Sequence, residues 1–165
     1  MPELPEIETV KLGIEKTVLG SVIISTKLFR RDLRFPVKEN LEKSILNKRV
    51  LGVGRRSKYL LFFLNKKTTL VLHLGMSGKI DVSIKSENEY KAKKHDHLII
   101  SFDSGFLLIY NDPRRFGFVE TIEGDHTNYQ RFKNLGIEPL SKKFNGKYLW
   151  LKIKSSSRTL KNILM

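Results

Sequence analysis

Short apolar runs separated by turn residues follow a single helical segment, and this arrangement restricts the chain to a mainly β fold. The opening segment carries Ile7, Val10, Ile14 and Val18 at helical spacing and stops at Gly20. The later runs are short, rich in Val, Ile, Leu and Phe, and bounded by turn residues, as strands are. The expected strands are residues 21–29, 50–53, 59–64, 69–74, 79–84, 97–103, 106–110 and 116–122.

Two of the separating segments, residues 65–67 and 103–105, have the composition of hairpin turns, which favours antiparallel pairing. Eight strands need a closed or layered arrangement. We therefore predict a mainly β fold with flanking helices, in the form of a two-sheet antiparallel β-sandwich with an N-terminal helix. We also expect helices at 39–46, 128–135 and 145–154, with Trp150 as a packing residue, and an exposed polar loop at 85–94.

The charge of the chain points to a polyanionic partner. Lys and Arg total 31 against 17 acidic residues, which gives a net charge of +14. Nucleic acid is the favoured partner, and a lysine-rich solvated surface is the alternative. The absence of cysteine excludes disulfides and thiolate metal sites within these residues. No basic leader or long apolar run is present, so we expect a soluble intracellular protein.

The N-terminal residues include a potential nucleophile. Removal of Met1 would leave Pro2 with a secondary amine beside the carboxylate of Glu3. An α-amino group has a pKa of about 7.7–8.0, so much of it is unprotonated at neutral pH and able to form a Schiff base. The alternative is structural, because Pro and Glu are ordinary residues of a first helical turn.

Two internal segments carry further candidate residues. Lys58 follows two arginines at the entry of a strand, and such a cluster either binds phosphate, lowers a lysine pKa or is simply solvated. Met76 lies in a turn between Gly75 and Gly78, where an exposed apolar tip could enter a base stack. A methionine packed under its own loop is the alternative.

The turn at 111–117 combines Arg114, Arg115 and Phe116. Arginine can contact a base edge or phosphate, and phenylalanine can replace a displaced base, so this turn is a candidate DNA-reading element. A cation–π contact on the surface is the alternative. His95 and His97 at strand spacing could suggest a metal, but two imidazoles and one carboxylate make an incomplete site.

Together these segments resemble the formamidopyrimidine-DNA glycosylase family. The matching segments are Met-Pro-Glu-Leu-Pro-Glu-Ile-Glu-Thr at 1–9, Arg-Arg-Ser-Lys-Tyr-Leu-Leu at 55–61, His-Leu-Gly-Met-Ser-Gly at 73–78, Lys-His-Asp-His at 94–97, Asp-Pro-Arg-Arg-Phe-Gly at 112–117 and Leu-Gly-Ile-Glu-Pro-Leu-Ser at 135–141. They occur in the family's order across nearly the whole chain. The start differs from the endonuclease VIII branch, which has glycine where Leu4 stands.

The resemblance implies a bifunctional enzyme of base-excision repair that acts on a nucleotide flipped out of double-stranded DNA. It would remove oxidised purines such as 8-oxoguanine and formamidopyrimidines, and then act as an AP lyase. Pro2 would attack the sugar C1′ and form a Schiff base, Glu3 would transfer protons, and Lys58 would assist proton transfer and phosphate binding. Neither a metal nor an organic cofactor takes part.

The resemblance also implies DNA-contacting positions. Met76, Arg114 and Phe116 match the residues that fill the vacated stack and read the orphaned base. His95, Arg114 and Lys161 match DNA contacts, and Glu6 would lie near the damaged base.

The chain departs from the family after about residue 150. We expect a catalytic β-sandwich domain at 1–150, and a linker with the truncated start of a helix-two-turn-helix module at 151–165. We expect no part of the family's C-terminal zinc finger within these residues, and by the resemblance Ser155–Ser157 would stand where relatives carry lysines. The first alternative is a truncated, non-catalytic DNA-binding remnant. A less favoured alternative is a basic RNA-binding β domain. We expect a monomer in a bacterial cytoplasm, associated with the nucleoid.

Overall fold

The computed structural model describes residues 2–164, and its internal packing divides the chain into two units, Met1–Phe132 and Lys133–Met165. The expected domain boundary at residue 150 stays a prediction. The elements of the first unit are α1 (Leu4–Val18), β1 (Ile23–Leu28), α2 (Leu41–Ile45), β2 (Val50–Arg56), β3 (Tyr59–Leu64), β4 (Thr68–His73), β5 (Lys79–Ser83), β6 (Asp96–Phe102), β7 (Leu107–Asn111), β8 (Phe118–Glu123) and the 3₁₀ turns η1 (His126–Asn128) and η2 (Gln130–Phe132). The second unit has α3 (Gly146–Ile153) and α4 (Leu160–Leu164).

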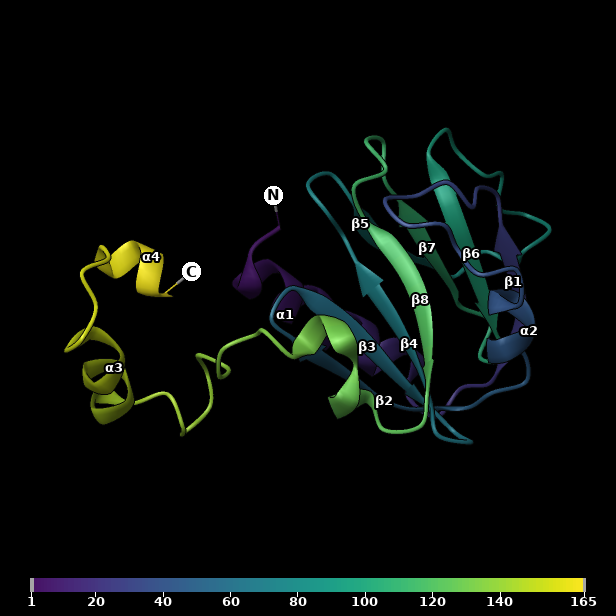
Figure 1. Ribbon diagram of the computed structural model, residues 1–165. Coiled ribbons are helices and arrows are strands. Elements are labelled where there is room, and N and C mark those ends of the chain that lie inside the picture. The colour runs from purple at the N-terminus through teal and green to yellow at the C-terminus, as the bar shows by residue number, and fades with distance from the viewer. Residues whose placement is uncertain (1, 165) are drawn as a thin grey trace. The chain divides into compact units, whose positions relative to one another are not determined.

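The strands form two four-stranded antiparallel sheets, in the orders β1-β6-β7-β5 and β2-β3-β4-β8 (Figure 1). Each of the eight expected strands is present, and the predicted fold class is confirmed. The expected turn at 65–67 joins β3 to β4 in a register that pairs Phe62 with Leu70. Lys66 and Lys67 both adopt left-handed backbone conformations there, which suit the twist of a hairpin.

The main core joins side chains from both sheets to one face of α1. Alternate residues of the strands enter it, for example Leu60, Phe62 and Leu64 of β3 and Leu98 and Ile100 of β6. This two-residue period is the one that a pleated strand imposes on side-chain direction. The core members from α1 are Ile7, Ile14 and Val18, whose spacing corresponds to one side of a helix.

The start of α1 is fixed by reciprocal hydrogen bonds, in which the Glu3 side chain accepts from the Glu6 backbone N–H. In return the Glu6 carboxylate accepts the Glu3 backbone N–H at 3.0 Å. This capping box satisfies two donors that a helix start leaves open. It also determines where the chain segment with Pro2 leaves the helix.

Strand β8 begins two residues later than expected, at Phe118 instead of residue 116. The Gly117 N–H donates to the buried Asp112 carboxylate at 2.8 Å, and Arg115 adopts a left-handed conformation. Residues 112–117 therefore form a turn. Phe116 belongs to that turn and not to the sheet.

The expected helix at 128–135 is wrong, because only the short turns η1 and η2 occur there. Tyr129 and Arg131 both donate hydrogen bonds to Glu120 of β8. Residues two apart do not share a face of an α-helix, so anchoring both to one carboxylate excludes helical backbone. Phe132 is buried against the rings of Tyr59 and Tyr129.

Of two further expectations, one is confirmed and the other is wrong. The 85–94 loop is mostly exposed, but Tyr90 packs on the outer apolar cluster of Ile99, Leu107 and Ile109. An apolar outer face needs such a cover, and the loop supplies it. Trp150 was expected to be a packing residue, yet it is 60% exposed, with the Lys154 ammonium 4.7 Å above its ring.

Candidate functional site

The start of α1 lies against the turn between β2 and β3. The Lys58 ammonium is 2.7 Å from a carboxylate oxygen of Glu3, and Pro2 immediately precedes this pair and is half-buried. The pair joins residues 55 positions apart (58 − 3). The three residues expected to be catalytic are thus neighbours, with the cation and the carboxylate in direct contact.

Arg55 holds the same two segments together from the interior side. Its guanidinium donates to Glu8 of α1 at 2.6 Å and to the Ser57 carbonyl at 2.9 Å. The Arg55 side chain is only 6% exposed. Arg55 is therefore not a solvated surface residue, and the binding of phosphate by the basic cluster at 55–58 stays a prediction. Removing the Glu8 carboxylate would leave a largely buried guanidinium without this opposite charge.

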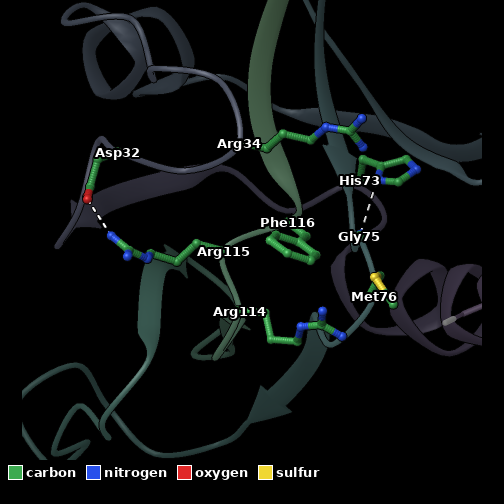
Figure 2. A pocket seen from close by; sticks show the side chains of 8 residues that line it. All are labelled: Asp32, Arg34, His73, Gly75, Met76, Arg114, Arg115 and Phe116. Carbon is green, nitrogen blue, oxygen red and sulfur yellow. Dashed lines mark hydrogen bonds and ion pairs between the residues drawn. The ribbon is translucent and has the colours of Figure 1, made fainter.

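A cavity of about 660 Å³ lies between the β4–β5 loop and the turn at 112–117 (Figure 2). Met76, Arg114 and Phe116 all line it, so the three residues expected to enter the stack come together. Met76 is 44% exposed and Phe116 is 41% exposed, and neither packs under its own loop. The Arg114 guanidinium carbon lies 4.5 Å from the centre of the Phe116 ring.

The other lining residues are Asp32, Arg34, His73, Gly75 and Arg115. The Arg115 guanidinium is 2.5 Å from Asp32, which also accepts two hydrogen bonds from Arg30. The hydrogen bonds from Arg30, and the charges of both arginines, hold the pKa of the Asp32 carboxyl far below its usual range. Asp32 is therefore ionised at neutral pH and partly offsets the positive charge of the cavity rim.

Asp112 fixes the two cavity loops to each other. Its carboxylate is fully buried and accepts from the Ser77 hydroxyl at 2.6 Å and the Tyr110 hydroxyl at 3.1 Å, besides Gly117. The Ser77 hydroxyl oxygen in turn accepts the Arg114 backbone N–H at 3.2 Å. Burial, with the nearby Asp112 charge, raises the pKa of Tyr110 well above its ordinary value, so this hydroxyl remains a donor.

His73 lines the cavity and also lies close to the turn between β2 and β3 that carries Lys58. It pairs across the sheet with Tyr59, the residue after Lys58, and its ring lies 5.1 Å from the Tyr59 ring. Burial lowers the pKa of His73 to about 4, with further contributions from the positive charges of Arg34, Lys58 and Arg131. The imidazole is therefore neutral at physiological pH.

The His95–His97 segment does not have the geometry of a metal site. His97 is buried, and its Nε2 lies 2.7 Å from the Asp112 carbonyl oxygen. The Asp96 carboxylate accepts from Asn111, Tyr90 and the Lys93 backbone N–H. Within residues 2–164, no group of three or more His, Cys, Asp or Glu is arranged to hold a metal ion.

His95 and Glu6 both make contacts that hold the backbone in place. His95 has a left-handed backbone, and its carbonyl accepts the Asp112 N–H at 3.0 Å, which ties it to the cavity turn. The Glu6 carboxylate is engaged in the helix cap. Lys161 belongs to the second unit, in α4. The DNA contacts of His95 and Lys161, and the position of Glu6 near a damaged base, stay predictions.

Several cavity residues were missed by sequence reasoning. The run Arg30-Arg31-Asp32-Leu33-Arg34 offered a signal for Arg34, since three arginines in five residues form a local basic cluster. The sequence offered no signal for the burial of Asp112 or for the contacts of His73, because both depend on loops that meet only in the fold.

Among the described residues, no helix is long and apolar enough to cross a membrane.

Comparisons with known proteins give one consistent result. Residues 1–119 match the model of the formamidopyrimidine-DNA glycosylase N-terminal domain. The formamidopyrimidine-DNA glycosylases of Rickettsia massiliae and Bartonella tribocorum are each 40% identical to this chain and align with all of it. The chain spans 58% and 60% of the lengths of these relatives.

Solved structures of the Lactococcus lactis formamidopyrimidine-DNA glycosylase also match. One, bound non-covalently to DNA with an AP site, superimposes with a TM-score of 0.85 at 34% identity, covering 99% of this chain and 62% of that one. Another, in complex with DNA containing Fapy-dG, has a TM-score of 0.85 at 34% identity, over 98% of this chain and 60% of that one. With a match over most of its length and the same sheet architecture, the chain belongs to the formamidopyrimidine-DNA glycosylase family.

Proposed function

We propose that this chain is the catalytic N-terminal part of a DNA glycosylase and AP lyase that removes oxidised purines from double-stranded DNA. The observation that most supports this function is the 2.7 Å contact between Glu3 and Lys58 directly beside Pro2. A terminal secondary amine, a carboxylate and a cation at one place supply a nucleophile, a proton carrier and a counter-charge.

The proposed reaction begins with the processed Pro2 nitrogen, whose lone pair attacks C1′ of a flipped-out nucleotide. The glycosidic bond breaks, and its electron pair leaves with the base, which takes up a proton. Loss of the nitrogen proton and opening of the C1′–O4′ bond then give an iminium, and Glu3 supplies the proton that O4′ receives. The carboxylate thus passes protons between nitrogen and oxygen.

Strand cleavage follows from the same intermediate. The iminium acidifies the C2′ proton, and its removal expels the 3′ phosphate by breaking the C3′–O bond. Lys58, already beside Glu3, is positioned to assist this proton transfer and to neutralise phosphate charge. Hydrolysis of the imine then frees Pro2 for another cycle.

The cavity supports the recognition half of the proposal. Met76, Arg114 and Phe116 lie around one space at the molecular surface, so an apolar tip, a cation and an aromatic ring are available to replace an extruded nucleotide. The net charge of +14 favours a DNA partner. Because the named relatives are bacterial, we place this action in a bacterial cytoplasm, at the nucleoid.

The family's structural zinc would belong to the part of the relatives that this chain does not match. The proposed reaction does not use this zinc. The helix-two-turn-helix module, which normally completes the DNA clamp, would likewise begin near residue 151.

Trapping with borohydride tests the proposal. Protein shown by intact mass to lack Met1 should form a covalent adduct with an 8-oxoguanine duplex, because borohydride reduces the imine to a stable amine. Protein that retains Met1 has an amide at Pro2 and should form none. Glu3→Gln should slow trapping strongly, whereas Glu39→Gln, on the exposed surface, should not. Absence of any adduct with processed protein would favour a non-catalytic DNA-binding remnant.

A further inference from the structure

His73, the last residue of β4, makes a hydrogen bond that the proposed chemistry does not use. Its Nδ1 lies 3.0 Å from the Gly75 backbone N–H, two residues further along (Figure 2). A backbone N–H can only donate, so Nδ1 must carry the lone pair. The neutral ring therefore bears its proton on Nε2.

The surroundings fix both the orientation and the charge of this ring. It stacks on Phe118 with a centroid distance of 5.4 Å and an interplanar angle of 4°. Burial and the cations Arg34, Lys58 and Arg131 lower the pKa of His73 to about 4. A protonated ring would lose the Nδ1 lone pair, and these contacts oppose that state.

The loop that His73 holds has little freedom to adjust. Gly75 has a φ of +62° and lies against the backbone of Phe116 and Gly117. At the far end of the loop, the Gly78 N–H donates to the Leu74 carbonyl at 2.8 Å. Met76 is thus carried by a segment fastened at both ends.

We propose that His73 is a positioning residue for Met76: by accepting the Gly75 N–H at Nδ1, it sets the loop conformation that presents the methionine side chain to the cavity. This role rests on the proposed function, in which Met76 enters the DNA stack. His73 then acts through Gly75, as a neutral Nε2–H tautomer.

Spectroscopy of the free protein tests the contact without DNA. Long-range ¹H–¹⁵N spectra near neutral pH should show a neutral His73 ring with an unprotonated Nδ1 and a protonated Nε2. With ¹³C-methyl methionine, the Met76 signal, assigned by its loss in Met76→Leu, should change as the pH falls through the His73 pKa. An Nδ1–H tautomer, a charged ring, or a Met76 signal insensitive to His73 titration would overturn the proposal.

Two near-isosteric variants separate positioning from direct DNA contact. Asn places its side-chain oxygen near the Nδ1 position and can still accept from Gly75, whereas Gln places its amide near Nε2. We expect His73→Asn to keep the preference for duplex with an abasic-site analogue over intact duplex within about twofold, because the hydrogen bond survives. His73→Gln should reduce that preference about fivefold, which corresponds to the loss of one net hydrogen bond.

The opposite order, rescue by Gln and not by Asn, would overturn the positioning role and indicate direct contact through Nε2. Urea unfolding of both variants checks that they are folded under the binding conditions. If the unmodified protein shows no preference for the abasic-site analogue, the proposed function fails, while the spectra of the free protein still decide the His73–Gly75 contact.

Discussion

Substitution of Gly75 by alanine should reveal how tightly the β4–β5 loop, which carries Met76, is packed against the turn at 112–117. An added Cβ would lie 2.5 Å from the Gly117 nitrogen and 2.7 Å from the Phe116 carbonyl oxygen. Both are backbone atoms of a turn anchored on Asp112, so neither can rotate away as a flexible side chain could. The two loops would have to separate.

Gly105 supplies the matched control. It has a φ of +84°, so alanine there has a similar backbone cost, but no atom lies within 4 Å of the added Cβ. A left-handed alanine costs roughly 1–2 kcal/mol, and forced overpacking adds about 1–3 kcal/mol. We therefore expect Gly105→Ala to lower the unfolding free energy by about 1–2 kcal/mol and Gly75→Ala by about 2–5 kcal/mol.

Equilibrium urea unfolding measures both variants, with equal m-values as the condition for comparing them. The difference between the two losses isolates the steric contribution from the backbone one. If Gly75→Ala is no more destabilising than Gly105→Ala, the close approach of the two loops is refuted.

Three further changes have defined outcomes. Because the pKa of His73 is lowered to about 4 in the folded protein but is about 6.5 when unfolded, the unfolded state binds a proton first. Stability relative to His73→Asn should therefore fall as pH drops from about 6.5 to 4, by at most about 3 kcal/mol, and a flat difference in urea unfolding would contradict this. Glu8→Gln removes a carboxylate that neutralises the 6%-exposed Arg55 side chain and should cost about 2–3 kcal/mol in unfolding free energy, against under about 1 for Asp81→Asn in the exposed Lys79–Asp81 pair; equal losses would refute the buried pair. Asp112→Asn should lower the melting temperature and shift the NMR signal of the Met76 methyl group, because an amide oxygen cannot accept from all three donors that the carboxylate satisfies. An unchanged melting temperature would argue that Asp112 does not hold the two loops together.

Local sequence features predicted the elements well wherever neighbouring residues decide the conformation. The β3–β4 hairpin is an example, since an apolar run, a polar turn and a second apolar run lie next to one another in the chain. The helical spacing of Ile7, Ile14 and Val18 likewise predicted which face of α1 is buried. The failures at Phe116 and at 128–135 occur where contacts with Asp112 and Glu120 override local preference.

By itself, the sequence determined the β-sandwich class, the basic character and the family, because periodicity, charge and motif order are written along the chain. Only the tertiary structure decided which charges meet. Arg55 finds Glu8 across 47 positions, and Asp112 gathers donors from two loops. Such contacts depend on how the strands and loops pack in three dimensions, because a buried charge or polar group is costly unless it is paired or hydrogen-bonded.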